Sequence, residues 1–357
     1  MSASSRGRWV YLAFYAANAA LLPVLTLYYE SVGVHGARLG VLAAIWPAGS
    51  VLGASLWGAV ADASGRHRLV LSGTIIASAL LAQALFLGEG FVTLVPIVTV
   101  FALSVAPVGP MLDNSVLLDL GTRQERFGRV RLWGAIGWGV SAPLVGLLID
   151  RTALAIVFPI YGLLMFVLLA TSLTLPVPRT SIGSGIFGGF ARIAGDRSWR
   201  FFLLLVLAAG TGSAFVHHYL FIYLAEIGGT GTIRGLALAV ATLSELLIFG
   251  LADRILARVR ARLLIVIAMA AAGIRMVAMG FIADPWLALG PQLLHGMSFS
   301  LLLVAGVDIA RRLAPEGMGA TAQALFSGTH MGAGGIAGAL IGGVLYRSMP
   351  VSRVYLV

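Results

Sequence analysis

The stretch Leu243–Phe299 decides how this chain folds, and it contains three segments of the same kind: LSELLIFGLAD (243–253), AAAGIRMVAMGF (270–281) and PQLLHGMSF (291–299). Each segment is largely apolar but carries a charged or titratable side chain in its interior: Glu245, Arg275 and His295 respectively. A charge at bilayer depth costs about 2.5 to 3.5 kcal/mol on insertion scales, so such side chains normally face a bundle interior or a water-filled cavity. We therefore interpret the three residues as a functional site inside membrane-crossing helices.

The composition of the whole chain agrees with this interpretation. Of its 357 residues, 59% are hydrophobic and only 11% are charged, and the mean hydropathy is +0.97. Soluble domains contain about 25% charged residues, so we predict an all-α membrane protein. The chain has no Cys and shows neither zinc-ligand spacing nor a phosphate-binding glycine loop. These features predict no enzyme activity, no metal and no cofactor.

Eleven apolar segments are each close to the roughly 20 residues that a helix needs to cross a hydrocarbon core of about 30 Å. They span residues 9–29, 38–60, 69–87, 91–118, 132–149, 153–175, 201–224, 235–252, 262–282, 286–308 and 319–345. Pro, Gly, Ser and four Arg concentrate in residues 176–200, which indicates a linker. We therefore expect an N-terminal six-helix bundle at residues 1–175 and a C-terminal bundle at residues 201–357.

Orientation follows from the basic residues. Eighteen of the 24 fall in loops on the side of the N-terminus, which places that terminus in the cytoplasm by the positive-inside rule. The net charge of +10 is therefore read as an orientation signal, and we expect no nucleic-acid partner.

The loop after the second segment reads Gly58-xxx-Asp62-xx-Gly65-Arg66-x-Arg68, and the loop after the eighth repeats part of it as Gly250-xx-Asp253-Arg254. The first loop resembles the signature loop of the major facilitator superfamily. That resemblance implies two pseudo-repeated six-helix bundles, with the twelfth helix missing from this chain. It also implies a cytoplasmic gate formed by Asp62, Gly65, Arg66, Arg68 and Asp253. The alternative is that these charges are solvated and simply anchor a turn.

The segment PMLDNSVLLDLGTRQERFGRVRLWGAIGWG (110–139) resembles the phenylpropionate permease and lactose permease group of proton symporters. The three segments quoted at the start have counterparts in the same group. This resemblance implies substrate contacts from one set of residues: Asp113, Arg131 and Trp138. It also implies that Glu245 binds substrate or couples protons, with Arg275 as its cationic partner and His295 as a hydrogen-bonding bridge. A purely structural buried ion pair is the alternative for Glu245 and Arg275.

Two departures from the lactose permease pattern concern the proton. Ser298 stands where that pattern has a proton-carrying carboxylate, and Val216–Tyr219 lies around the position of another acid. The stretch Val216–Tyr219 contains His217 and His218, which are candidate substrate contacts. Only one of two neighbouring residues can face a given side of a helix. The missing carboxylate points to the phenylpropionate branch or to a relocated proton site.

We predict proton-coupled symport of a small polar organic solute, which is a sugar, a nucleoside or an aromatic acid, by alternating access. A proton-driven exporter of drugs or metabolites and a non-transporting membrane sensor or scaffold on the same fold are the alternatives. We expect a monomer in the bacterial cytoplasmic (inner) membrane. Its partners are the small-molecule substrate and the lipid bilayer, and the proton is its coupling ion.

Overall fold

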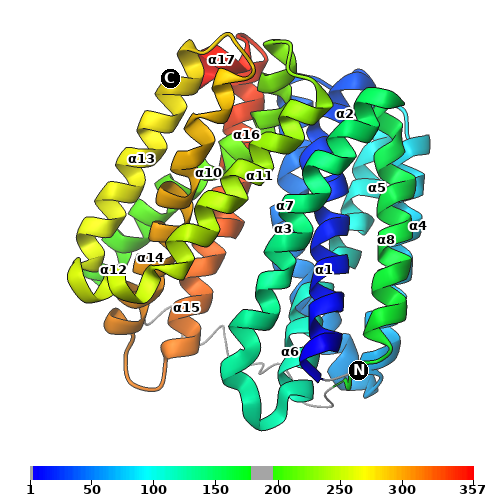
Figure 1. Cartoon of the computed structure of the whole chain (residues 1–357), viewed down its shortest axis with the longest axis vertical. Helices are drawn as coiled ribbons and strands as arrows, with labels where there is room; N and C mark the ends of the chain where they lie inside the picture. The colour runs from blue at the N-terminus through cyan, green and yellow to red at the C-terminus, as the bar shows by residue number, and fades with distance from the viewer. Residues whose placement is uncertain (1–2, 178–195) are drawn as a thin grey trace. The chain divides into compact units, whose positions relative to one another are not determined.

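The computed structural model describes residues 3–177 and 196–357, and every secondary-structure element in these ranges is helical (Figure 1). The predicted all-α fold class is confirmed. Most of the predicted linker, residues 176–200, lies outside the described residues.

The first half of the chain forms helices that follow the predicted apolar segments. They are α1 (Ala3–Leu21), η1 (Leu22–Val24), α2 (Leu25–Ser31), α3 (Gly36–Ser64), α4 (His67–Leu87), α5 (Gly90–Val105), α6 (Val108–Leu120), η2 (Gly121–Arg126), α7 (Phe127–Arg151), η3 (Leu154–Ile156) and α8 (Val157–Ser172).

The second half contains α10 (Arg197–Glu226), α11 (Gly231–Gly250), α12 (Ala252–Arg258), α13 (Ala261–Phe281), η4 (Leu287–Leu289), η5 (Pro291–Leu294), η6 (Gly296–Ser300), α14 (Leu301–Leu313), α15 (Gly319–Ser327), η7 (Gly328–Ala333), α16 (Gly334–Tyr346) and α17 (Val351–Val354). Segments η6 and η7 are π-helical. Such segments are rare and are often found at functional sites.

Ten stretches of helix within the described residues are long and apolar enough to cross a membrane. One of them, Gly90–Arg151, contains 62 residues, far more than the roughly 20 that one crossing needs. Gly121, with a φ of +56°, interrupts this stretch between α6 and α7. The stretch therefore holds two of the eleven predicted crossings.

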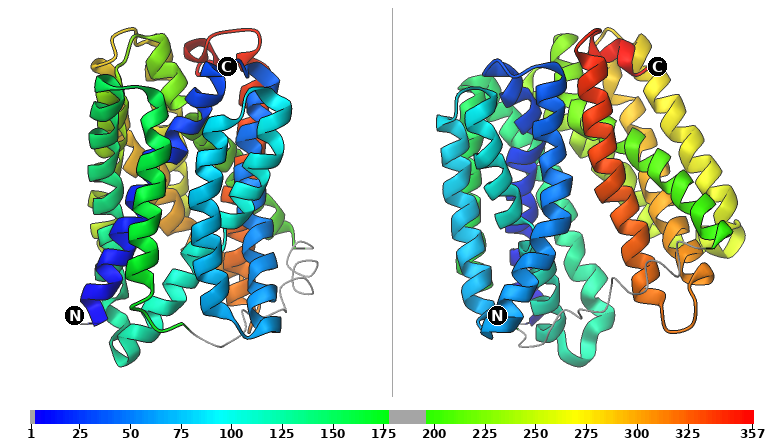
Figure 2. Two further views of the ribbon diagram at one scale, coloured as in Figure 1. Left: turned by 90° about the vertical axis from the view of Figure 1, so that its right-hand side faces the viewer. Right: turned by 180° about the vertical axis from the view of Figure 1, so that it is seen from behind.

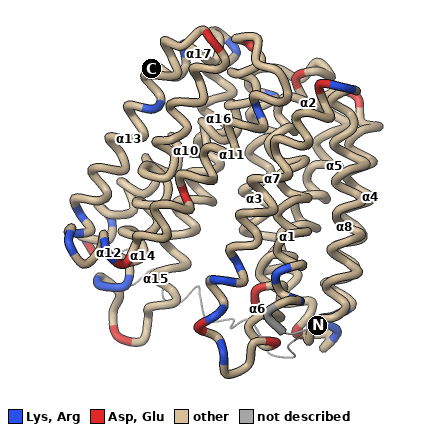
Figure 3. Tube along the Cα trace, in the orientation of Figure 1, with Lys and Arg blue, Asp and Glu red and all other residues tan. Residues whose placement is uncertain are grey.

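Large apolar side chains cover much of the outside of the helices, as expected of a protein whose solvent is lipid. Leu52, Leu80 and Leu163 are examples of such exposed side chains. Charged residues gather instead toward the ends of the helices, with few along their length (Figure 3). The chain is therefore a multi-pass membrane protein.

The described helices pack as two compact units. One unit contains α1, α2 and α4 to α8, most of α3, and residues Thr230–Ala239 from the start of α11. In it, α1 packs against α7 and α8 (Figure 2). The other unit contains the remaining helices from α10 onward together with His35–Pro47, the start of α3. In it, α10 packs against α16 and α13 packs against α14.

Each unit therefore includes a short helical segment from the other half of the sequence, and glycines make both of these contacts close. A Cβ on Gly235 would meet the carbonyl of Ala142 in the first unit, and one on Gly40 would meet that of Ala339 in the second. Small residues at such positions let helix backbones approach. The start of α3 thus packs with helices of the second half of the chain, and the start of α11 packs with helices of the first half.

Candidate functional site

The first group of polar side chains, here called the N-terminal cluster, consists of Tyr11, Tyr15, Asp113 and Arg131, and it joins α1, α6 and α7. Arg131 Nη1 donates to Asp113 Oδ2 at 2.6 Å, while the Tyr11 hydroxyl donates to Oδ1, also at 2.6 Å. Arg131 Nη2 donates to the Tyr15 hydroxyl at 3.1 Å. Both carboxylate oxygens and both terminal guanidinium nitrogens thus have partners.

Local sequence explains how this cluster is placed. Pro has no N–H and fixes φ, so Pro107 separates α5 from α6 shortly before Asp113. Tyr11 and Tyr15 are four residues apart and therefore share one face of α1. A Cβ on Gly134 of α7 would meet the Tyr15 ring, so this glycine leaves room for the tyrosine.

The N-terminal cluster is accessible. The Arg131 side chain is 44% exposed and the Asp113 side chain is 29% exposed. Trp138 is half-buried two turns further along α7, and the structure does not bring it into the hydrogen bonds of this cluster. An accessible acid and arginine can bind a solute that both donates and accepts hydrogen bonds.

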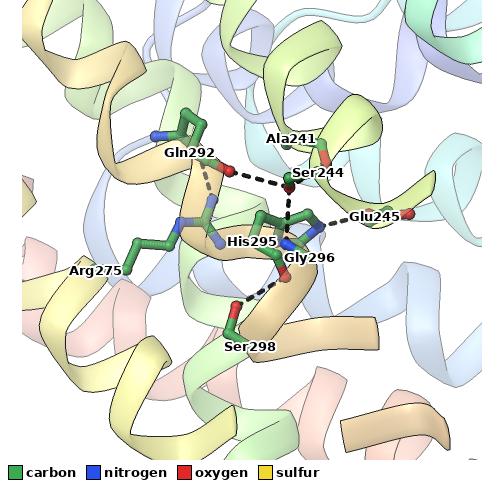
Figure 4. Close-up of polar contacts among 8 residues, drawn as sticks. All are labelled: Ala241, Ser244, Glu245, Arg275, Gln292, His295, Gly296 and Ser298. Carbon is green, nitrogen blue, oxygen red and sulfur yellow. Dashed lines mark hydrogen bonds and ion pairs between the residues drawn. The ribbon is translucent and has the colours of Figure 1, made fainter. Parts of the chain in front are cut away.

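The second group, here called the C-terminal cluster, contains Ser244, Glu245, Arg275, Gln292 and His295 (Figure 4). His295 Nε2 pairs with Glu245 Oε1 at 2.7 Å, and His295 Nδ1 lies 2.8 Å from Arg275 Nη1. Arg275 Nη2 donates to Gln292 Oε1 at 2.5 Å. The imidazole therefore lies between the acid and the arginine, as the resemblance implies, and links them in a continuous chain of hydrogen bonds.

This geometry also sets the tautomer of a neutral imidazole. Arg275 is always a donor, so Nδ1 of a neutral His295 must accept its hydrogen bond. The proton of the neutral ring is then on Nε2, which donates to the Glu245 carboxylate. These hydrogen bonds therefore place two proton acceptors, Glu245 and His295, next to each other.

Irregular backbone surrounds His295. The residue lies between the 3₁₀ segment η5 and the π segment η6, a feature not anticipated from regular helical spacing. The Gly296 N–H donates to Ser244 Oγ at 2.8 Å, and a Cβ on Gly296 would meet the Ser244 carbonyl. This close contact between the Ser244 and Gly296 backbones brings the adjacent residues Glu245 and His295 together from two different helices.

Arg275 differs from Arg131 in its burial. Its side chain lies inside the second unit at 6% exposure, and Gln292 is fully buried beside it. Tyr355, which follows α17, lies within electrostatic range of Arg275, and burial raises the pKa of its hydroxyl. The neutral tyrosine therefore leaves Glu245 as the acid of the C-terminal cluster that balances the charge of Arg275.

The two neighbouring histidines of α10 lie at right angles. The His217 and His218 rings are 5.6 Å apart at 77°. His217 lies within electrostatic range of His295, Glu245 and Arg275. His217 is thus the one that the structure brings near the C-terminal cluster.

The residues predicted to form the gate lie at the junction of α3 and α4. Gly65 has a φ of +64°, a conformation that favours glycine, and it allows the reversal between the two helices. Asp62 Oδ1 pairs with Nε2 of His67 at 2.9 Å. His67 was not among the predicted residues, because the resemblance drew attention to the arginines on either side of it.

The predicted arginines and the second aspartate of the gate have separate surroundings. Arg68 donates to the carbonyls of Leu173 at 3.1 Å and Leu175 at 2.8 Å, just beyond α8. Arg66 and Asp253 are exposed. A gating role for these residues stays a prediction.

The predicted site residues did not include four members of the two clusters: Tyr11, Tyr15, Ser244 and Gln292. The spacing of four residues between Tyr11 and Tyr15 could have indicated Tyr11, because it puts both tyrosines on one helix face. Gln292 lies three residues before His295, a spacing that puts two side chains on one face of a helix. Its contact with Arg275, however, depends on a different helix.

Comparisons with known proteins agree on one class. The model of a family described as MFS_1 like family matches residues 6–357. A maltose permease from Geobacillus stearothermophilus is 29% identical over 97% of this chain and 88% of its own length. A probable 3-phenylpropionic acid transporter from Escherichia coli is 25% identical over 95% of this chain and 91% of its own length.

A solved structure matches the fold. The crystal structure of nucleoside transporter NupG aligns with a TM-score of 0.88 over the whole of this chain and 95% of its own, at 16% identity. At this identity the match shows a shared fold alone.

Proposed function

The chain belongs to the MFS_1 like family and is a membrane transporter rather than an enzyme; on that premise we propose that it is a proton-coupled symporter of a small polar organic solute. Family membership confirms the resemblance to the major facilitator superfamily that the Gly58–Arg68 loop indicated. The solute is a sugar, a nucleoside or an aromatic acid, and transport proceeds by alternating access.

The observation that carries this proposal is the chain of hydrogen bonds Glu245–His295–Arg275. A carboxylate and an imidazole in contact form one coupled titrating unit, and the imidazole changes charge near neutral pH when unperturbed. The positive charge of Arg275 disfavours a positive charge on the neighbouring His295 but stabilises the Glu245 carboxylate. Solute that replaces the imidazole as the partner of Glu245 changes how readily this unit holds a proton.

The N-terminal cluster supplies solute contacts in this proposal. Its acid and arginine are partly exposed, and they present acceptors and donors side by side. The names of two relatives, a maltose permease and a probable 3-phenylpropionic acid transporter, support a small organic solute. Trp138 and His217 remain further candidate contacts.

The proposed setting is the bacterial cytoplasmic membrane with the N-terminus in the cytoplasm. The distribution of arginines supports this orientation. We propose that the protein works as a monomer, with the proton as coupling ion and no other cofactor.

Uptake into proteoliposomes tests the proposal. An imposed inward proton gradient should drive accumulation of one compound from a panel of maltose, uridine and 3-phenylpropionate. Glu245→Gln should abolish the gradient-driven part, because it removes the carboxylate that holds the proton. Glu316→Gln is the matched control, since Glu316 is exposed and outside both clusters. Accumulation that is the same with and without the gradient would contradict proton coupling.

A further inference from the structure

Both clusters are electrically balanced. The N-terminal cluster contains one carboxylate and one guanidinium, 2.6 Å apart, and its other members are tyrosine hydroxyls. The C-terminal cluster also contains one of each, joined through His295. With a neutral imidazole, neither cluster has a net charge with which to attract a charged solute.

The two arginines differ in what they offer to a solute. Arg275 is buried, with Nη1 and Nη2 occupied by His295 and Gln292. Arg131 is 44% exposed, but its Nη1 already donates to Asp113. Only Arg131 therefore presents substantial guanidinium surface within these clusters, and an acid in direct contact neutralises it.

Two other arginines on α1 have partners of their own. Arg6 pairs with Asp119, and Arg8 lies over the Trp133 ring, 5.7 Å from its centre. They are not members of the N-terminal cluster. The charge that a solute meets there is thus set by Asp113 and Arg131.

A carboxylate solute would meet a repulsive group at this place. To reach Arg131 it must approach Asp113 or displace it, and like charges in contact are strongly unfavourable. A neutral solute with vicinal hydroxyls meets no such repulsion. One hydroxyl can donate to an Asp113 oxygen while its neighbour accepts from the guanidinium, and hydrogen bonds to charged groups are the stronger kind.

We propose that Asp113 determines the charge class of the solute: by neutralising Arg131 it restricts the N-terminal cluster to neutral solutes with vicinal hydroxyls and excludes carboxylates. The vicinal diol belongs to a sugar ring, either in a free saccharide or in the ribose of a nucleoside. This inference rests on the proposed transport function and selects among its three solute classes.

Binding to purified protein in detergent tests the inference without any gradient. Isothermal titration with maltose, uridine and 3-phenylpropionate should give binding of one neutral compound to the wild type and at least tenfold weaker binding of the acid. Which neutral compound binds separates the saccharide from the nucleoside. Asp113→Asn keeps the shape of the side chain and frees the charge of Arg131. This variant should bind the neutral compound about tenfold more weakly and 3-phenylpropionate at least tenfold more tightly than the wild type does.

Two further variants make the result specific. The double variant Asp113→Asn/Arg131→Gln should lose the gained affinity for the acid, because the freed guanidinium is gone. Glu316→Gln should leave all affinities unchanged, which excludes a general effect of removing negative charge. Thermal unfolding of each variant verifies folding. If Asp113→Asn does not fold, competition on the wild type decides: 3-phenylpropionate should fail to displace the bound neutral compound.

The outcomes separate this inference from the proposed symport. Wild-type protein that prefers 3-phenylpropionate, binds none of the three compounds, or gains no affinity for the acid on Asp113→Asn overturns the inference. Neutral binding with the expected switch, but no gradient-driven accumulation in proteoliposomes, supports the inference and counts against proton coupling alone.

Discussion

The N-terminal and C-terminal clusters use the same two charged groups in different ways. In the first, Asp113 and Arg131 touch directly and are partly exposed. In the second, His295 stands between Glu245 and a buried arginine. In the proposed function the inserted imidazole makes the second pair a unit that exchanges a proton, whereas the direct pair in the first cluster contacts the solute. Burial of the arginine and one added residue are thus the structural differences between the two clusters.

The largest expected difference between the clusters is in stability. Arg275→Met should lower the free energy of unfolding by about 3 kcal/mol, because Glu245 and Gln292 lose the buried cation that they face. Arg131→Met should cost less than about 1 kcal/mol, as exposed ion pairs contribute little. Denaturant unfolding in detergent, followed by circular dichroism, measures both. Equal losses would show that the difference in burial has no energetic consequence.

A second pair of variants compares how the clusters are held. Gly296→Ala should destabilise the fold by about 2 kcal/mol, because the new Cβ meets the Ser244 backbone and that backbone must shift. The three atoms nearest to a Cβ added at Gly134 belong to the Tyr15 ring, a side chain that can shift, so we expect Gly134→Ala to cost less stability and to weaken solute binding. Unfolding and titration together measure these effects. Gly273→Ala, where the added Cβ meets nothing within 4 Å, is the control.

A third prediction concerns His295, the imidazole of the proposed proton-exchanging unit. A gradient of one pH unit is worth about 1.4 kcal/mol per proton, or about tenfold accumulation by a one-proton symporter. His295→Gln keeps a donor for Glu245 but cannot titrate, so gradient-driven accumulation should fall by about this factor. Exchange of solute between equal concentrations at equal pH should fall much less. If both fall alike, His295 acts in binding and not in coupling.

The smallest predicted effect distinguishes the two tyrosines of the N-terminal cluster. Tyr11→Phe removes a 2.6 Å hydrogen bond to the Asp113 carboxylate and should weaken solute binding by about 1 kcal/mol, roughly fivefold. Tyr15→Phe removes a 3.1 Å bond from Arg131 and should have less effect. Isothermal titration of the two variants measures the difference. A larger effect from Tyr15 would mean that Arg131, rather than Asp113, is the group that needs positioning.

Much of the fold was predictable from local sequence. Apolar stretches of about 20 residues become helices because only a helix satisfies its own backbone in lipid. The candidate residues Asp113, Arg131, Glu245, Arg275 and His295 also stood out, since a charge in an apolar helix is costly unless it has a function or a partner.

Tertiary structure decided how these residues meet. Tyr11 reaches Asp113 across 102 positions of chain, and no periodicity within α1 specifies that contact. The π segment beside His295 likewise depends on the crossing of Gly296 with Ser244.

The sequence by itself therefore determined the membrane class, the helices and the identity of the charged residues, because hydrophobicity and charge act residue by residue. Only the packing of helices decided that one acid touches its arginine directly and the other through a histidine. The reason is that side chains on different helices become neighbours through close backbone approach, which depends on the surfaces of both helices at once.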